Sequence, residues 1–299
     1  MRFIQEQQEY EEPSDFLNDT LEALTRQWKN GTTPTVSYHA QMALIYSNKK
    51  MVEECRQHAE LVPDDASATD RLNTYIALAR MLVYEKNLPK AIEYYRKALE
   101  ADAANSMALE EIGCCLYELQ QFEDAAEYFE LATIEEPHLS NLWEGRGMCA
   151  AQLEQYEEAI ACFNKAVETD EQQYDLAHYQ YYTGYCYEKM GDFYRALSYY
   201  TKSLDADPTL ANSLNNMAAL YFEHESDIKT AIKYLKQAET VAETNDDDQL
   251  LQLVCINLSR LYKMTLDYDN ESHYKQKLFS LLGLGDVMNF DDDDEEEEE

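Results

Sequence analysis

The sequence predicts an all-α protein built from repeated helix pairs. Glycine and proline are scarce, with 8 and 6 among 299 residues, whereas 45% of the residues are apolar and 24 are tyrosines. A β-sandwich or barrel needs frequent turns rich in Gly and Pro, so this composition favours helices. The second observation is an internal period of 34 residues, which predicts that the helices recur in pairs.

The period is clearest in the middle of the chain. Ala91, Ala125 and Ala159 lie 34 residues apart, and each is followed four residues later by an aromatic residue and seven residues later by another alanine. A small residue, Ala or Gly, lies twelve positions before each of them. These offsets put one apolar stripe on each of two successive helices. Because a single pair cannot cover its own stripes, the pairs are expected to stack.

This spacing resembles the tetratricopeptide repeat, a 34-residue helix-turn-helix unit whose pattern runs W-x2-L-G-x2-Y, then A-x3-F-x2-A and a final Pro. Pro137 and Pro208 occupy the last position of two units. The resemblance implies a right-handed superhelical solenoid of antiparallel helix pairs, in which the first helices of successive units line a concave groove.

The repeat register divides the chain as follows. A leading helix over 13–31, bracketed by Ser14 as N-cap and Gly31 as stop, precedes a degenerate helix pair over 32–71. Residues 72–251 hold the five repeats, at 72–105, 106–139, 140–173, 177–210 and 211–245, and a degenerate capping unit covers 252–285. Three extra residues precede the fourth repeat, and the fifth has one extra residue in its turn, both tolerated in loops.

The two ends of the chain match the repeat less well. In the capping unit Glu271 and Lys275 stand where Ala and an aromatic residue are usual, which predicts a helix that faces solvent. Residues 1–12 and the acidic tail over 286–299 are predicted to be disordered.

The net negative charge of the chain indicates which kinds of partner it attracts. The 24 Lys and Arg against 59 Asp and Glu give a net charge of −35, and the terminal run 291–299 supplies nine of the negative charges. Such a surface repels nucleic-acid backbones and anionic membranes and favours a basic protein or peptide. The same charge also keeps a protein soluble. The tail therefore has two interpretations. Either it shields or mimics a site for a basic partner, or competes for the ends of the protein's own groove, or it only keeps the protein soluble.

Signal sequences, membrane-spanning segments and cysteine motifs indicate the compartment of a protein. The N-terminal stretch has no apolar core of a secretory signal, and no apolar run approaches the roughly 18 residues of a membrane-spanning helix. Seven cysteines are scattered without a CxxC motif, which favours a reducing, cytoplasmic setting.

No motif in the sequence predicts catalysis, a cofactor or a metal site. Cys115, Cys149 and Cys186 all occupy repeat position 10, where the family usually has a small buried residue, so a packing role is favoured over a redox or metal role. The six histidines show no H-E-x-x-H spacing. We therefore expect a protein that is not an enzyme.

The resemblance also implies where a partner binds. In this family positions 2, 5, 9 and 12 of each unit face the groove, and extended peptides or partner helices lie there. Carried onto this chain, those positions give the partner-binding candidates Asn73, Arg80, Glu110, Tyr117, Asn141, Glu144, Met148, His178, Tyr181, Tyr185, Glu188, Asn212, Asn215 and Phe222.

These candidates predict an interaction scaffold or adaptor that binds a protein partner with basic and apolar residues, through carboxylates and aromatic faces. Two alternatives remain open, a chaperone-like holder of a basic partner and a self-associating array that uses the Tyr-rich region 178–200. The oligomeric state is not predicted, and the Tyr-rich helix over 177–189 serves either as groove or as packing.

Overall fold

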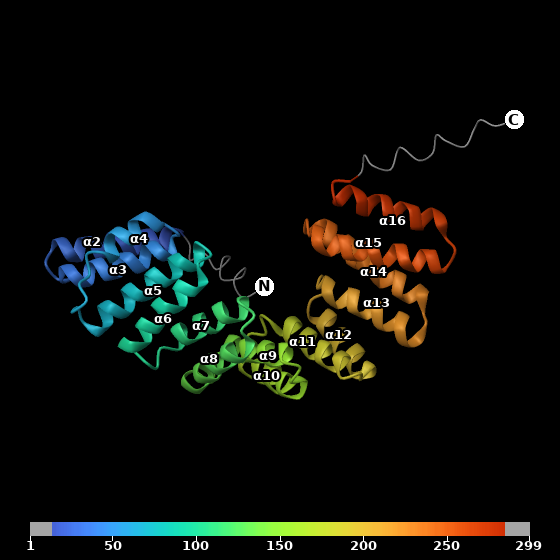
Figure 1. Ribbon diagram of the computed structural model, residues 1–299, viewed down its shortest axis with the longest axis horizontal. Helices are drawn as coiled ribbons and strands as arrows, with labels where there is room; N and C mark the ends of the chain where they lie inside the picture. Colours follow the sequence, from blue (N-terminus) through green and yellow to red (C-terminus); the bar gives the residue numbers. More distant parts are fainter. Residues whose placement is uncertain (1–13, 285–299) are drawn as a thin grey trace. The chain divides into compact units, whose positions relative to one another are not determined.

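The computed structural model describes residues 14–284, and every regular element in that range is a helix. The predicted all-α fold of antiparallel helix pairs is confirmed (Figure 1). The described residues form two compact units, unit 1 up to residue 171 and unit 2 from residue 172. The predictions of disorder for 1–12 and for the acidic tail over 286–299 concern residues outside the described range.

Unit 1 stacks three full helix pairs on a leading helix and a shorter pair. Its helices are α2 (Ser14–Lys29), α3 (Thr35–Asn48), α4 (Val52–Ala59), α5 (Ala68–Tyr84), α6 (Leu88–Ala101), α7 (Ser106–Glu118), α8 (Phe122–Glu135), α9 (Ser140–Gln152) and α10 (Tyr156–Thr169). Within each full pair the two helices pack together, and the second helix also packs on the first helix of the next pair. Each unit of the repeat thus supplies the surface that covers its neighbour.

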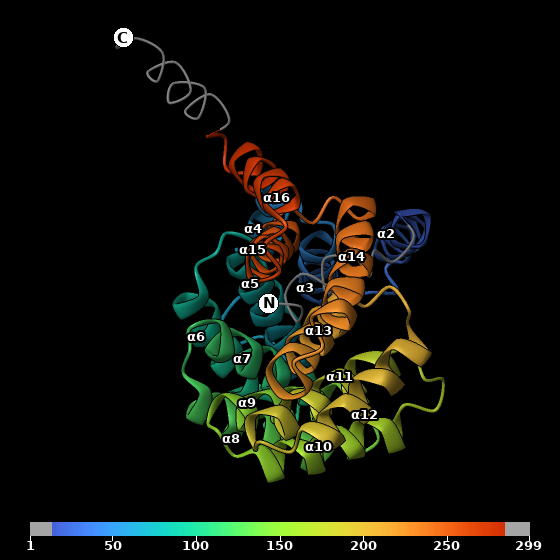
Figure 2. The ribbon, with the colours of Figure 1, turned by 90° about the vertical axis from the view of Figure 1, so that its right-hand side faces the viewer.

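Unit 2 repeats the arrangement with three pairs, seen stacked one on another in Figure 2. Its helices are α11 (Leu176–Lys189), α12 (Phe193–Ala206), α13 (Ala211–Glu225), α14 (Ile228–Thr244), α15 (Asp248–Met264) and α16 (Tyr268–Leu281). The predicted degenerate capping unit is therefore a complete helix pair.

Two first helices begin four residues before the repeat register places them. The Ser67 side chain accepts a hydrogen bond from the backbone N–H of Asp70 at 3.1 Å, so α5 begins four residues before the register start. Asp247 caps α15 in the same way through the N–H of Leu250 at 3.0 Å. A register fixes which residues face the core, whereas the local capping side chain fixes where the helix begins.

The core consists of the recurring small and aromatic residues. Ala91, Ala125 and Ala159 are fully buried, and so is each aromatic residue four positions later. Ser203, which replaces the usual Ala in the fourth repeat, is buried as well, and its hydroxyl lies 2.9 Å from that of Ser213 on α13. The hydroxyl is tolerated there because it has a hydrogen-bonding partner.

The prediction that Glu271 faces solvent is wrong. Glu271 is 6% exposed, and its carboxylate lies 2.6 Å from Lys275 Nζ one turn further along α16. Tyr274, three residues after Glu271, is also buried and stacks on Tyr262 of α15. Lys275 itself is exposed, so the last helix buries a carboxylate beside a solvent-facing lysine of its own. A substitution pattern cannot distinguish this arrangement from a fully solvated face.

The turn inside each helix pair contains one residue in the left-handed region. Lys86, Gln120, Glu154 and Gly191 have φ values of 61°, 59°, 61° and 77°. In each case the N–H of this residue and the N–H of the next residue bond to carbonyls of the preceding helix, as in the Schellman motif. Only the fourth repeat uses Gly at this position.

We expect Gly191→Ala to lower the free energy of unfolding by about 1 kcal/mol, because a Cβ is disfavoured at positive φ. Apart from its chain neighbours, no atom of the described residues lies within 4 Å of the place that this Cβ would take, so the cost is one of backbone conformation alone. Urea unfolding followed by circular dichroism measures the effect. An Ala variant as stable as the parent would contradict it.

Candidate partner-binding site

The first helices of unit 1 bring together one guanidinium and a pair of adjacent carboxylates. Arg80 on α5 donates to Asn48 Oδ1 at 2.7 Å and to Met107 Sδ at 2.9 Å. Its Nε lies 3.8 Å from a carboxylate oxygen of Glu111 on α7. Glu111 is only 7% exposed, so burial raises its pKa while Arg80 opposes the increase.

Glu110, the neighbour of Glu111, is the candidate whose charge is most affected by its surroundings. Asn141 on α9 donates a hydrogen bond of 2.6 Å to Glu110 Oε1. Burial first, and then the charge of Glu111, raise the pKa of Glu110 to about 7 against the lowering effects of Asn141 and Arg80. This Glu110–Glu111 pair therefore holds two carboxylates opposite a single cation.

The other candidates of unit 1 are partly or fully buried. Tyr117 packs edge-on against Phe122 at the start of α8, with ring centroids 5.2 Å apart. Met148 is 7% exposed and offers little surface to a partner. Asn73 and Glu144 are partly buried on α5 and α9.

In unit 2 the Tyr-rich helix α11 contributes both to packing and to the surface. Tyr181 packs beside Tyr200 of α12, with ring centroids 5.8 Å apart, and burial raises its pKa to about 12. Tyr185 is partly buried beneath Lys189, whose Nζ lies 5.0 Å from the ring centroid. Glu188 accepts a hydrogen bond of 2.6 Å from the Tyr200 hydroxyl. The Glu188 carboxylate thus already has a donor within its own unit.

A chain of amides continues this network along unit 2. Asn216 Nδ2 donates to the Tyr200 hydroxyl at 3.1 Å, and Asn257 Nδ2 on α15 donates to Asn215 Oδ1 at 3.0 Å. Asn215 was among the sequence candidates, but Asn216 and Asn257 were missed, because both occupy repeat position 6, outside the four positions that face the groove in the family. The remaining candidates of unit 2 are exposed Asn212 and partly buried His178 and Phe222.

The chemistry of the described residues gives no sign of a metal centre. Within 14–284 no group of three or more His, Cys, Asp or Glu side chains is placed to hold an ion. All seven cysteines are free and buried, and burial raises the pKa of Cys115, Cys149 and Cys186 to about 12. Over the same range no helix has both the length and the apolar composition to cross a lipid bilayer.

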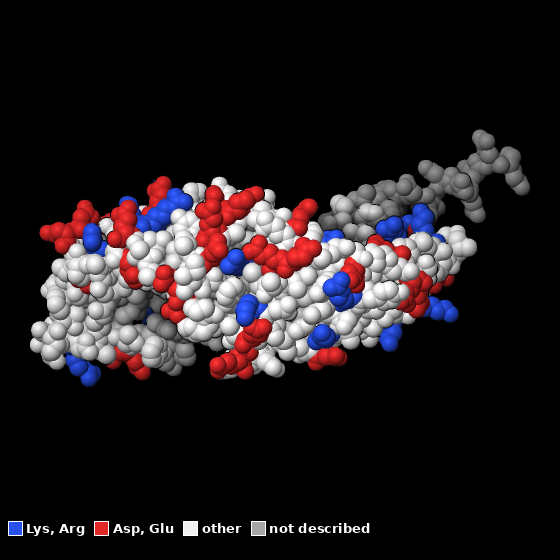
Figure 3. Space-filling model, turned by 90° about the horizontal axis from the view of Figure 1, so that it is seen from below, with Lys and Arg blue, Asp and Glu red and all other residues white. Residues whose placement is uncertain are grey.

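Charge is unevenly distributed over the helices. On the face shown in Figure 3, acidic side chains form several clusters, with Lys and Arg between them. The second helix of the second repeat, α8, has the exposed acids Glu123, Asp124, Glu127 and Glu130 and contains no Lys or Arg.

These features define a helix-pair repeat protein whose first helices present polar and acidic side chains. The tetratricopeptide repeat family matches residues 76–140 and 138–209. Residues 76–209 accordingly match the tetratricopeptide repeat, as the spacing predicted. A curated relative, the Photosystem I assembly protein Ycf3 of Rippkaea orientalis, is 30% identical over 96 residues, which is 28% of this chain. The match spans 56% of the length of that relative.

Solved structures are similar over much of the chain. The type IV pilus biogenesis factor PilW covers 72% of this chain and 97% of its own, with a TM-score of 0.61 and 20% identity. PilF of Pseudomonas aeruginosa covers 74% and 97%, with a TM-score of 0.58 and 20% identity. The C-terminal part of a repeat protein from Cytophaga hutchinsonii covers 81% and 95%, with a TM-score of 0.61 and 14% identity. At these identities the similarity shows the fold alone.

Proposed function

We propose that this protein is a non-enzymatic scaffold that binds a basic and apolar segment of a protein partner across α5, α7 and α9 of unit 1. The observation that carries the proposal is the Glu110–Glu111 pair, where the only cation within ion-pair distance among the described residues is Arg80, 3.8 Å from Glu111. A Lys or Arg side chain brought by a partner would lie between like charges that now repel each other. Binding would then relieve a repulsion already present in the free protein.

The comparisons support a protein or peptide as the ligand, since tetratricopeptide-repeat proteins generally bind such partners. The Rippkaea relative is named as an assembly protein, which is consistent with a role in holding another protein. Seven free, buried thiols support a reducing compartment such as the cytoplasm. Glu188 of unit 2 is a weaker anchor than Glu110, because its carboxylate already accepts from Tyr200 and lies 3.8 Å from Lys189 Nζ.

The test is fluorescence anisotropy of the full chain with a labelled peptide of alternating Arg and Leu residues, against a peptide of alternating Gln and Leu. We expect the Arg peptide to bind at least tenfold more tightly. Glu110→Gln should remove most of that difference, and Glu123→Gln on the outer helix α8 should leave it within about twofold, because exposed charges are screened. Equal losses in the two variants would show a non-specific response to net charge and would overturn the proposed site.

The same titration has an expected pH dependence. A partner cation lowers the pKa of Glu110 from about 7, so the complex favours the ionised carboxylate. Affinity for the Arg peptide should therefore rise from pH 6 to pH 8 and level off above that range. A flat profile in the parent protein, or the same slope in Glu110→Gln, would contradict the role of Glu110.

A further inference from the structure

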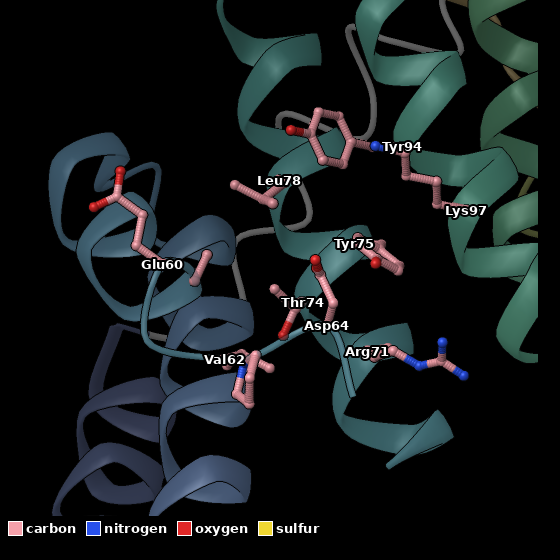
Figure 4. Close-up of a pocket in the computed structure, with 11 residues that line it drawn as sticks. Glu60, Val62, Asp64, Arg71, Thr74, Tyr75, Leu78, Tyr94 and Lys97 are labelled. Carbon is pink, nitrogen blue, oxygen red and sulfur yellow. The ribbon is translucent and has the colours of Figure 1, made fainter. Parts of the chain in front are cut away.

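Unit 1 contains a pocket of about 260 Å³ that is separate from the proposed partner-binding face (Figure 4). It lies between the α4–α5 connection, α5 and α6. Its wall includes Leu78 and the rings of Tyr75 and Tyr94, and two cations, Arg71 and Lys97, also line it. Pockets for drug-sized ligands usually have volumes of roughly 300–1,000 Å³. This pocket is therefore of a size to hold one side chain or one small group.

Among the described residues, neither cation of the pocket is held in an ion pair. Arg71 Nε is buried and has no hydrogen-bond partner. Lys97 Nζ lies over the faces of two rings, 4.7 Å from the centroid of Tyr94 and 6.0 Å from that of Tyr75. Neither side chain forms an ion pair with any carboxylate in the part of the chain that the structure describes. A negatively charged ligand in this pocket therefore meets two cations that no ion pair already occupies.

Two acids on the rim restrict what that ligand can be. Glu60 and Asp64 also line the pocket, and both are exposed. In Figure 4 the Glu60 carboxylate points away from Arg71 and Lys97. Rim carboxylates repel a polyanion such as a polyphosphate more than they repel a single negative charge. A monoanion with apolar surface beside it fits the two cations, the two rings and the rim together.

We propose that this pocket binds a carboxylate that a partner protein presents next to an aromatic or aliphatic group. The Arg71 guanidinium and the Lys97 ammonium, which both line the pocket, attract the carboxylate. The neighbouring apolar group packs on Leu78 and on the rings of Tyr75 and Tyr94. The ligand is opposite in charge to the one proposed for the Glu110–Glu111 pair, so the two sites are experimentally separable.

The experiment measures binding of short fluorescent peptides to the full chain. One probe has an internal Asp-Phe pair between blocked ends, a second ends in Phe with a free C-terminal carboxylate, and a third has Asn-Phe between blocked ends. We expect at least one carboxylate probe to bind ten times more tightly than the Asn-Phe probe. The first two probes distinguish a side-chain carboxylate from a chain terminus. Failure of both carboxylate probes to exceed the Asn-Phe probe would overturn the proposal.

Charge-removing variants locate the binding. Arg71→Gln and Lys97→Gln should each weaken the tighter carboxylate probe by about tenfold, the effect of one charge-assisted contact. Lys90→Gln, an exposed change of the same charge on α6, should stay within about twofold. Lys97 is exposed, so its variant tests the site even where Arg71→Gln disturbs folding. Equal effects of Lys90→Gln and Lys97→Gln would contradict the assignment.

The two proposals fail independently. Arg71→Gln should leave binding of the Arg-Leu peptide unchanged, and Glu110→Gln should leave binding of the carboxylate probe unchanged. Loss of both activities in either variant, with helicity preserved, would show one shared site and would overturn the separate pocket.

Discussion

Glu110→Gln is expected to stabilise the protein at pH 8, by about 1–3 kcal/mol, while it weakens binding of a basic peptide. Burial and Glu111 raise the pKa of Glu110 from 4.5 to about 7, so between these values the native state holds a proton that the unfolded chain has released. Native stability is therefore lost as the pH rises through this window. The Gln side chain is neutral at every pH and keeps an oxygen that accepts from Asn141.

Urea unfolding at a series of pH values measures this effect. The gain from Glu110→Gln should be full at pH 8 and should fall to less than half by pH 5.5, because the native carboxyl is then protonated in the parent. Glu123→Gln, which removes an exposed charge from α8, should change stability by less than about 0.5 kcal/mol at either pH. A Glu110→Gln variant that is less stable than the parent at pH 8 would refute the charge conflict. A charge whose removal stabilises the fold does not serve stability, so its presence is consistent with a role in binding.

Gly145→Ala is the second change with a large expected effect, a loss of about 1–3 kcal/mol. A Cβ on Gly145 of α9 would lie 2.6 Å from Cζ and 2.7 Å from Cδ1 of Phe129. Phe129 is 1% exposed, and on its other side a Cβ on Gly113 would lie 2.9 Å from Cε2 of the ring. The ring of α8 is thus held between two glycines, one in its own repeat and one in the next.

Whether Gly145→Ala stabilises or destabilises the protein depends on two opposing contributions, helix propensity and steric overlap. In an open helix Gly→Ala stabilises by about 1 kcal/mol, because Ala has the higher helix propensity. Here steric overlap with a fully packed ring outweighs that gain. Thermal and urea unfolding of Gly145→Ala, Phe129→Leu and the double variant make up the test, and the double variant should cost less than the sum of the two. A more stable Gly145→Ala variant would show that the ring can move aside.

The sequence predicted the repeats because the fold depends on a few residue types at fixed offsets. Ala125 and Phe129 are buried by any stack of such pairs, so their spacing was sufficient. The start of α5 was not predicted, because it depends on the single side chain of Ser67. The burial of Glu271 was also missed, because the repeat spacing does not show that Lys275 forms an ion pair with it.

The candidate site was predicted less completely than the fold. The register selected Glu110 and Arg80, but no repeat position indicates that Glu110 and Glu111 would compete for one guanidinium. Gly145, Asn216 and Asn257 all occupy position 6, which faces the neighbouring helix closely enough to restrict residue size or to share a hydrogen bond. The pocket at Arg71 and Lys97 involves three helices and a connection, and spacing within one repeat does not show such a combination.

The reaction rates of the buried thiols measure how often the helices around them open. Cys55 lies in α4, Cys149 in α9, Cys186 in α11 and Cys255 in α15, and burial raises the pKa of each to about 11 or 12. At pH 7 roughly one in ten thousand or fewer of these groups is a thiolate, so a closed pair hardly reacts with an alkylating reagent. Labelling at each cysteine then requires transient opening of the helices packed around it, as at Cys55, whose thiol donates to the Ala77 carbonyl of the next pair. The rates, measured by mass spectrometry in native buffer, give the free energy of local opening at four places along the chain.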